Sequence, residues 1–177
     1  MTDDHPSAGG PLPGPIRQTG HVVRDLGASM DRWLALGVGP WFVLPPAPQA
    51  VTYRGTEVAP EVTIAFANSG SLQVELIAQL DDTSSVYREF LDAGHEGLHH
   101  HAWWSADFEG AHGRATAAGW TTFVEGDGNG FARYCYLERS DLPSVVVELM
   151  ELTEFTAVFM DAIHQASIDW DGRDPVR

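Results

Sequence analysis

The chain has 177 residues, 44% of them hydrophobic, which is enough to bury one sizeable core or two small fused ones. Its formal net charge is −15, and it contains ten Lys and Arg residues, all of them arginines. Phosphate binding needs clustered cationic groups, so this composition argues against nucleic acid as a partner and disfavours heavily anionic substrates. A single arginine could still bind one substrate carboxylate.

Location and partners are inferred from equally coarse features. The apolar runs, such as residues 144–150, are far too short to cross a bilayer, and the first residues lack the charged-then-apolar order of an export signal. Cys135 is the only cysteine, so no intramolecular disulfide can form, which is typical of a reducing compartment. We therefore expect a soluble, cytoplasmic protein that does not bind membranes and that acts on a small molecule.

The first half of the chain begins with residues 1–15, which are rich in Pro, Gly and Asp and which we expect to form a disordered N-terminal tail. A strand is predicted next over residues 16–23, and apolar residues at helical spacing predict a helix over residues 26–36. Residues 37–40, with two glycines and a proline, end that helix. Four further strands are predicted over residues 41–44, 51–54, 62–68 and 72–77.

The second half repeats this order after a connecting helix. That helix is predicted over residues 81–93, because residues 82–85 offer helix caps ahead of apolar residues at helical spacing. After Gly94 come a strand, a helix and three strands, and a last helix completes the chain. The predicted bounds of these six elements are 98–105, 108–118, 121–125, 131–137, 145–150 and 154–166.

An internal repeat connects the two halves. Four landmarks of the first half, a polar residue, an aspartate, an apolar residue and a helix-ending glycine, recur at one constant offset of 82 residues. Gln18, Asp25, Leu26 and Gly37 correspond to His100, Asp107, Phe108 and Gly119. A strand with a glutamate directly before a leucine also recurs, at Glu75 and Glu148.

The repeat predicts an α+β protein made of two tandem βαβββ modules. Their strands are expected to form one curled mixed sheet around a cleft, and a C-terminal helix follows the second module. The predicted organisation is a tail, a first module, a connecting helix, a second module and a C-terminal helix with its own tail. The bounds of these five parts are 1–15, 16–80, 81–94, 95–152 and 153–177.

Four polar residues are expected to meet where the strands of the two modules lie side by side. Gln18 and Glu75 come from the first module, and His100 and Glu148 come from the second, each among apolar neighbours where an unpaired charge would be costly. Two carboxylates, an imidazole and an amide oxygen suit one divalent metal ion, Zn²⁺, Ni²⁺, Co²⁺, Mn²⁺ or Fe²⁺. Such a cation would polarise a substrate carbonyl, and Glu148, or alternatively Glu75, could act as the catalytic base on the neighbouring C–H.

Each of these assignments has a purely structural alternative. Gln18 can be an ordinary polar strand residue, and Glu75 and Glu148 can be solvated carboxylates that face outward. Because side chains alternate along a strand, His21 faces away from Gln18. A one-residue bulge would reverse this and make His21 the alternative metal ligand.

Three consecutive histidines raise the same question in the second module. Alternation puts His99 and His101 on one face of their strand and puts His100, together with Trp104, on the other. The repeat selects His100 as the ligand because it corresponds to Gln18. The alternative is a surface histidine cluster that binds metal adventitiously.

Aromatic residues are frequent on the strands that should line or back the cleft: Trp41, Phe42, Trp104, Phe131, Tyr134 and Tyr136. Core packing explains most of them, and the others are expected to form an apolar pocket for a ring-bearing or acyl substrate. Arg133 is the predicted anchor for a substrate carboxylate. The predicted substrate pocket consists of Trp41, Trp104, Arg133 and Tyr134.

Five short motifs, at residues 16–18, 22–26, 72–77, 97–100 and 147–149, carry a resemblance that covers nearly everything from residue 16 to residue 151. In these motifs the sequence resembles the vicinal oxygen chelate superfamily, which includes glyoxalase I, methylmalonyl-CoA epimerase, extradiol dioxygenases and the fosfomycin and bleomycin resistance proteins. The fourth motif, which contains two histidines, looks most like the epimerases, whereas the Gln, Glu, His, Glu order looks like the eukaryotic-type glyoxalase I site. The resemblance implies a paired βαβββ fold, one divalent metal ion and commonly a homodimer.

Three departures from the family pattern leave the substrate open. Gln18 stands where the epimerases have a histidine, and residues 138–141 replace a His-Pro-Lys type turn before the last strand. The basic residues that hold coenzyme A or glutathione have no counterpart in this sequence.

We therefore expect a glyoxalase-like, metal-dependent isomerase, epimerase or lyase that removes a proton next to a metal-bound carbonyl of a small aromatic or acyl substrate. One alternative is an Fe²⁺ dioxygenase of the same fold, which becomes preferable if His21 replaces Gln18 at the metal. The other is a non-catalytic binding or resistance protein that sequesters an aromatic metabolite without turnover.

Overall fold

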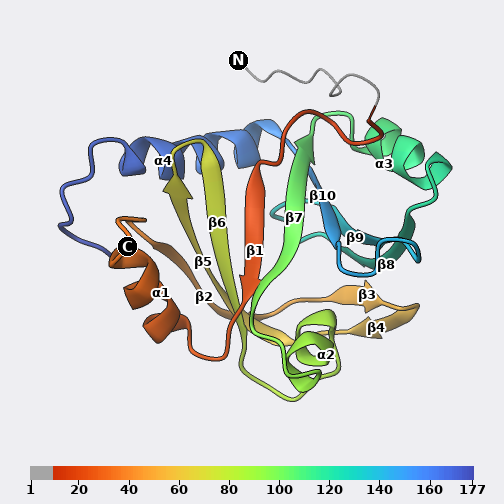
Figure 1. Ribbon diagram of the computed structural model, residues 1–177, viewed down its shortest axis with the longest axis horizontal. Coiled ribbons are helices and arrows are strands. Elements are labelled where there is room, and N and C mark those ends of the chain that lie inside the picture. The colour runs from red at the N-terminus through yellow and green to blue at the C-terminus, as the bar shows by residue number, and fades with distance from the viewer. Residues whose placement is uncertain (1–9) are drawn as a thin grey trace.

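The computed structural model describes residues 10–177 (Figure 1). Residues 1–9, most of the predicted N-terminal tail, lie outside the described residues. Residues 10–15 form no helix or strand, but Pro13 is buried and Leu12 packs against the core. Among the described residues, no helix is both long enough and apolar enough to cross a membrane.

Residues 10–177 form ten strands and four helices. The first βαβββ unit consists of β1 (Gln18–Val22), α1 (Leu26–Leu34), β2 (Phe42–Pro48), β5 (Glu61–Ser69) and β6 (Leu72–Gln79). The second unit consists of β7 (Gly97–Ser105), α3 (Phe108–Ala117), β8 (Thr121–Gly126), β9 (Tyr134–Glu138) and β10 (Val147–Glu151). The remaining elements are β3 (Val51–Tyr53), β4 (Thr56–Val58), α2 (Val86–Asp92) and α4 (Glu154–Ser167).

All strands belong to one mixed sheet with the order β2-β5-β6-β1-β7-β10-β9-β8-β3-β4. The two units join along β1 and β7, which pair antiparallel in the middle of the sheet. β6 lies parallel to β1, and β10 lies parallel to β7, so each unit places its last strand beside its first. The predicted α+β fold, with two tandem βαβββ modules, a curled mixed sheet and a C-terminal helix, is confirmed.

The repeat landmarks have local structural roles that explain their recurrence. Asp25 and Asp107 are the N-caps of α1 and α3, and each carboxylate accepts a hydrogen bond from a backbone N–H of the first helical turn. A cap of this kind stabilises a helix by about 1 kcal/mol. Gly37 and Gly119 follow the two helices with φ of 81° and 91°, a left-handed conformation that favours glycine.

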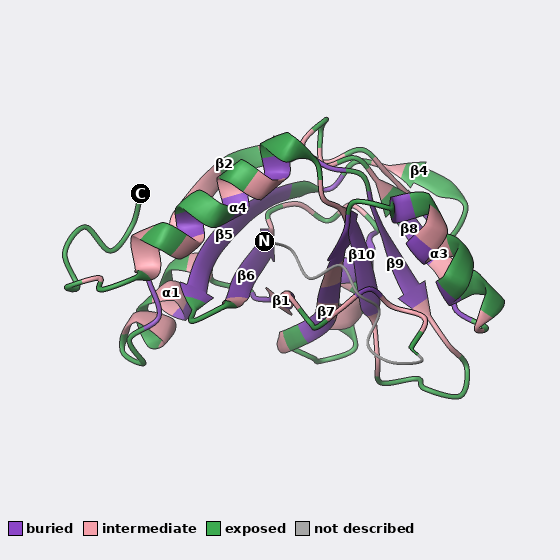
Figure 2. Ribbon diagram, turned by 90° about the horizontal axis from the view of Figure 1, so that it is seen from above, coloured by how far each residue is buried: buried purple, intermediate pink, exposed green. Residues whose placement is uncertain are grey.

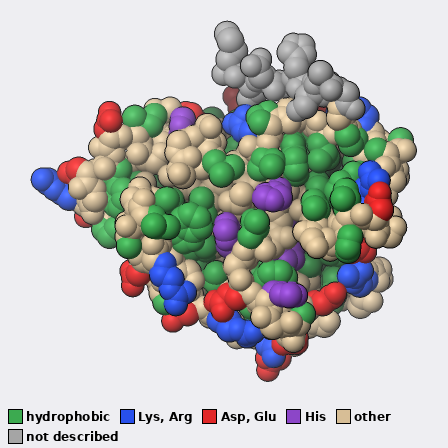
Figure 3. Space-filling view, in the orientation of Figure 1, with side chains coloured by type: hydrophobic (Ala, Val, Ile, Leu, Met, Phe, Trp, Pro, Cys, Tyr) green, Lys and Arg blue, Asp and Glu red, His purple; other side chains and the backbone are tan. Residues whose placement is uncertain are grey.

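The sheet curls into a half-barrel, seen end-on in Figure 2, with helices on both of its faces. α1 and α3 cover the outer face, and each packs on its own core cluster. α2 and α4 contribute Tyr87 and Met160 to the inner cluster, which also contains Phe66 and Tyr136 from the sheet. On the face drawn in Figure 3, charged side chains lie mainly at the rim, whereas hydrophobic and histidine side chains gather near the centre.

The hairpin of β3 and β4 is the main departure from the predicted topology. The strand expected over residues 51–54 exists as β3, but it pairs with β8 of the second unit, and β4 was not predicted. β2 is at one edge of the sheet and β8 is near the other, so the chain crosses from one edge to the other between β2 and β3. Tyr53 anchors the hairpin in the inner core cluster.

The residues after α4 return to the first unit. The Trp41 N–H donates to the Pro175 carbonyl oxygen at 2.8 Å, and the Val43 N–H donates to that of Arg177 at 3.0 Å. The Arg177 N–H in turn donates to the Trp41 carbonyl oxygen at 2.8 Å. The predicted C-terminal tail therefore provides hydrogen-bond partners for the otherwise unpaired edge of β2.

Candidate metal centre

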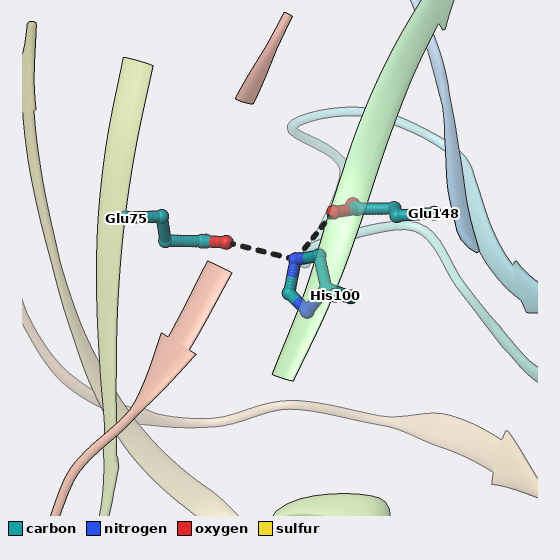
Figure 4. A group of neighbouring side chains, drawn as sticks. All are labelled: Glu75, His100 and Glu148. Carbon is teal, nitrogen blue, oxygen red and sulfur yellow. Dashed lines mark ion pairs between the residues drawn. The ribbon is translucent and has the colours of Figure 1, made fainter. Parts of the chain in front are cut away.

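Three titratable side chains from three strands converge inside the half-barrel (Figure 4). Glu75 comes from β6, His100 from β7 and Glu148 from β10. His100 Nε2 lies 2.9 Å from a carboxylate oxygen of Glu148 and 3.4 Å from one of Glu75. One ligand atom from each residue lies within 4.8 Å of the other two, and all three side chains are buried.

Glycine in β1 makes room for this arrangement. Gly20 lies between Glu75 of β6 and His100 of β7 in the strand register. A Cβ atom at this position would overlap the imidazole ring of His100. The ring can therefore lie over the β1 backbone and reach both carboxylates only because residue 20 has no side chain.

Gln18 is buried and lines the same inner cavity as the two glutamates. Its amide nitrogen donates to Oε1 of Gln73 at 2.9 Å, and the Gln73 amide donates to the Met160 sulfur of α4 at 3.1 Å. This chain uses the Gln18 nitrogen as a donor and leaves its oxygen as the available ligand atom. Gln18, Glu75, His100 and Glu148, the four predicted ligands, are thus all buried on the inner side of the sheet.

The donor atoms fit a divalent cation better than they fit one another. His100 Nε2 and a Glu148 carboxylate oxygen are buried and 2.9 Å apart, yet neither has a hydrogen bond of good geometry. Buried polar atoms without such a bond are rare and costly in folded proteins. One imidazole nitrogen and several carboxylate or amide oxygens are ligands that Zn²⁺, Mn²⁺, Co²⁺, Ni²⁺ and Fe²⁺ accept.

The pKa shifts of these groups reflect the same crowding. Burial raises the pKa of Glu75, and the charge of Glu148 adds to this, while the neighbouring His100 opposes it. Burial alone would lower the pKa of His100, but interaction with Glu148 and Glu75 outweighs it and raises the pKa to about 9. Both shifts favour proton uptake, which offsets the charge of the two buried carboxylates as a bound cation would.

The inner cavity beside these residues is small, with a volume of about 70 Å³. Aromatic and aliphatic side chains form most of its wall, including Phe66, Phe131 and Met160. Its tyrosines are Tyr87, Tyr134 and Tyr136, and burial raises the pKa of each above the usual value. Their hydroxyls therefore stay protonated. Those of Tyr87 and Tyr136 share a hydrogen bond of 3.0 Å, which leaves one of that pair and Tyr134 to donate to a bound oxygen.

His99 belongs to this centre as well, which strand alternation did not predict. The β1–β7 register jumps from Gly20 opposite His100 to His21 opposite Leu98, so that His99 is an extra residue in β7. The bulge turns His99 inward beside His100, whereas His101 is only half-buried. The expectation that His99 and His101 share a face is therefore wrong, and the histidine run itself was the only signal in the sequence.

The alternative ligand His21 lies on the outer face of the sheet. Its ring packs edge-on against Trp33 of α1, with ring centroids 5.3 Å apart. A bulge does occur at this point of the β1–β7 pairing, but the extra residue is in β7. The alternation of β1 is therefore undisturbed, and Gln18 and Gly20 keep the inner face.

Two of the four predicted pocket residues do not line this inner cavity. Trp41, the residue before β2, is fully buried in the outer cluster. It packs there with residues of α1, on the face of the sheet opposite the cavity. Arg133 lies before β9, donates to Glu109 at 2.6 Å and stacks over the Phe108 ring of α3, so it cannot anchor a substrate in the cavity.

The other two predicted pocket residues are on the inner side. Tyr134 lines the cavity. Trp104 belongs to the inner cluster, where the Arg17 guanidinium lies 5.0 Å from its ring centroid, but it does not line the cavity.

Fold and site together define the class: a protein of two βαβββ units with a buried centre of two carboxylates and one imidazole. The family model of the Glyoxalase/Bleomycin resistance protein/Dioxygenase superfamily matches residues 17–137, and the chain belongs to this superfamily. The superfamily typically binds a divalent metal ion. No curated protein has a significant match to the sequence.

Solved structures share the fold at low sequence identity. Methylmalonyl-CoA epimerase from Mycobacterium tuberculosis matches with a TM-score of 0.62 and 21% identity, over 88% of this chain and 98% of that one. A hypothetical protein from Bacillus halodurans C-125 matches with a TM-score of 0.62 and 20% identity, over 79% of this chain and 95% of that one. A Streptomyces coelicolor methylmalonyl-CoA epimerase variant in complex with 2-nitronate-propionyl-CoA has a TM-score of 0.58 and 20% identity, with coverages of 79% and 95%.

Proposed function

We propose that this chain is a divalent-metal-dependent enzyme of glyoxalase type, an isomerase, epimerase or lyase, that removes a proton from the carbon next to a substrate carbonyl. The observation that carries the proposal is the convergence of three buried ligand atoms, from Glu75, His100 and Glu148, beside an inner cavity. Buried titratable groups of this kind are concentrated at functional sites because burying them without a task is costly.

Gln18, Glu75, His100 and Glu148 would hold the metal ion. When bound, the cation supplies Lewis-acid polarisation of a carbonyl oxygen, which acidifies the neighbouring C–H. All four ligands are buried, so bulk water is kept from the reacting atoms, and electrostatic interactions in the cavity are strengthened.

The proton is taken by one of the two glutamates. Glu148 and Glu75 are the two candidates for this role, because both carboxylates line the cavity. Burial raises the pKa of Glu75, which makes that carboxylate a stronger base than an exposed one. The tyrosine hydroxyls at the cavity wall can donate hydrogen bonds to the oxygen on which negative charge develops.

The substrate is proposed to be a small aromatic or acyl compound without a large anionic group. None of the described residues that line the inner cavity is Lys or Arg, and most are aromatic or aliphatic. The coenzyme A ester that appears with one structural neighbour is therefore not transferred to this chain. The homodimer and the cytoplasmic location stay predictions.

The site argues against the dioxygenase alternative. Fe²⁺ oxygenases usually use two histidines and one carboxylate, whereas one histidine and two glutamates converge here. His21, which would supply the second histidine, is on the other face of the sheet. The non-catalytic binding protein remains the competing proposal, because an apolar cavity can also hold a ligand without turnover.

Metal content and proton exchange test the proposal together. Wild-type protein and His100→Ala are purified without chelator, analysed for bound metal, and loaded in turn with Zn²⁺, Ni²⁺, Co²⁺, Mn²⁺ and Fe²⁺. Each sample is then incubated in D₂O with a panel of small aryl and acyl carbonyl compounds, and loss of the proton next to the carbonyl is followed by NMR. We expect one metal ion per wild-type chain, metal-dependent exchange, and neither in His100→Ala.

Two results would contradict this expectation differently. If the wild type binds none of the five metals, the metal centre is refuted. If it binds a metal and an aromatic carbonyl compound but exchanges no proton, the binding protein replaces the enzyme as the better description.

A further inference from the structure

We propose that His99 is a positioning residue for the metal centre: it accepts a hydrogen bond from Nδ1–H of His100 and so makes Nε2 of His100 the ligand atom. This inference rests on the proposed metal site. His99 would not touch the metal ion or the substrate, and it would act only through the ring of His100.

The two ring nitrogens of His100 face different partners. Nε2 points to the carboxylates of Glu148 and Glu75, at 2.9 and 3.4 Å. Nδ1 lies 3.0 Å from Nδ1 of His99, within hydrogen-bond distance. Only one of these two nitrogens can carry the proton of a neutral imidazole that binds a metal ion. A proton on Nδ1, donated to His99, leaves the Nε2 lone pair for the metal.

His99 is itself held rigidly, as a positioning residue must be. Its ring makes a T-shaped contact with Phe90 at 5.1 Å and another with Tyr87 at 6.0 Å, both from α2. A third ring, Tyr136 of β9, lies 5.8 Å away. These contacts surround a side chain that is only 9% exposed. The nitrogen that faces His100 is therefore fixed in direction before any metal ion binds.

The bulge in β7 is what allows this contact. Neighbouring residues of a regular strand point to opposite faces, so their side chains cannot bond to each other. The extra residue in β7 puts the rings of His99 and His100 on the same face, with ring centroids 5.3 Å apart and nearly perpendicular planes. Bulges re-aim side chains in this way next to functional sites.

Two substitutions separate hydrogen bonding from packing. His99→Phe keeps a ring between Phe90 and Tyr136 but removes the acceptor. His99→Asn removes the ring but puts its side-chain oxygen close to where Nδ1 was. His95→Phe is the matched control, because His95 also contacts Phe90, at a centroid distance of 5.2 Å, but is exposed and does not contact His100.

The measurement is the affinity of the full chain for Co²⁺ and Zn²⁺, by calorimetry or by competition with a chelator, with circular dichroism to check folding. We expect His99→Phe to weaken metal binding by roughly 10- to 100-fold, as loss of the outer partner of a metal-binding histidine does. His99→Asn should recover most of the loss, and His95→Phe should bind like the wild type. In Zn²⁺-loaded wild type, ¹⁵N NMR should show His100 protonated at Nδ1.

The outcomes distinguish this inference from the proposed function. Normal metal binding by His99→Phe, or equal weakening in His99→Asn and His99→Phe, would show that His99 only packs, and the metal site would stand without it. An unprotonated Nδ1 of His100 in the Zn²⁺-loaded wild type would overturn the inference even if the variants failed to fold. Absence of metal binding by the wild type would refute the proposed centre and the inference with it.

Discussion

The two βαβββ halves place different residues at equivalent points of the same strand register. Gly20 lies beside Glu75 of β6 in the first half, and Ala102 lies beside Glu148 of β10 in the second. The glutamates are therefore true counterparts. The counterpart of His100 is Gln18, and both side chains are buried on the inner side. The carboxylates were kept in both halves, whereas the residues between them diverged.

This difference shows where a repeat can vary without losing a shared site. His100 lies over Gly20, and Gln18 lies opposite Ala102 across the β1–β7 pair. A ring needs the glycine beneath it, while a slender amide tolerates a methyl group. The halves also differ after β2, because only the first half carries the hairpin that pairs with β8.

The largest expected effect tests whether the two glutamates have equal roles. Glu148→Gln should keep the fold and lower the exchange rate by about 10²- to 10⁴-fold, as loss of a general base does. Glu75→Gln is its counterpart in the repeat. Rates of both variants are compared in the D₂O exchange assay after the metal content of each has been measured. Full activity in Glu148→Gln would remove this residue from the mechanism.

Gly20 and Ala102, which occupy equivalent positions of β1 and β7, give the next contrast. Gly20→Ala forces a methyl group into the His100 ring and should lower the free energy of unfolding by about 1–3 kcal/mol, the usual cost of overpacking. Metal affinity should fall with it. Ala102→Gly, at the equivalent position of β7, should cost only about 0.5–1 kcal/mol and leave metal binding intact. Urea denaturation of the metal-free and metal-loaded variants measures both.

Gln18 and His100 can be compared as ligands. Gln18→Ala should weaken metal binding by roughly tenfold, because one neutral oxygen ligand is lost. This is the lower end of the roughly 10- to 100-fold loss of metal affinity that follows removal of a supporting residue at a metal site. Gln18→His would make the two halves alike and should retain the metal ion. Chelator competition measures both affinities. Unchanged binding in Gln18→Ala would show that Gln18 is a structural residue of β1, linked only to Gln73.

The smallest effect concerns neighbouring residues at the start of β9. Arg133 forms an exposed ion pair with Glu109, so Arg133→Ala should change stability by no more than about 1 kcal/mol and leave turnover unchanged. Tyr134→Phe removes a hydroxyl from the cavity wall and should change turnover or substrate affinity instead. A large loss of substrate affinity in Arg133→Ala would restore the arginine as an anchor.

Much of the site could be predicted from local patterns. Asp25 and Asp107 mark helix starts, and the constant offset between them placed Gln18 and His100 at corresponding points. Alternation along β1 then put Gln18 and His21 on opposite faces, and in the structure Gln18 lines the cavity while His21 packs against Trp33 of α1. These inferences needed only chain geometry, because spacing within a module is conserved by its own helix caps and turns.

The rest was decided by contacts between distant segments. Alternation identifies two faces of a strand but not which one is inner, so Trp41 and Arg133 were assigned to the wrong side. A bulge depends on the register of two paired strands, and so the sequence of β7 alone did not reveal that His99 turns toward His100. The pairing of the hairpin with β8 likewise depends on which edge of the open, curled sheet offers free backbone groups. The sequence by itself determined the repeat, the fold class and the set of candidate ligands, whereas the tertiary structure determined their surroundings, because strand pairing and burial depend on the whole sheet.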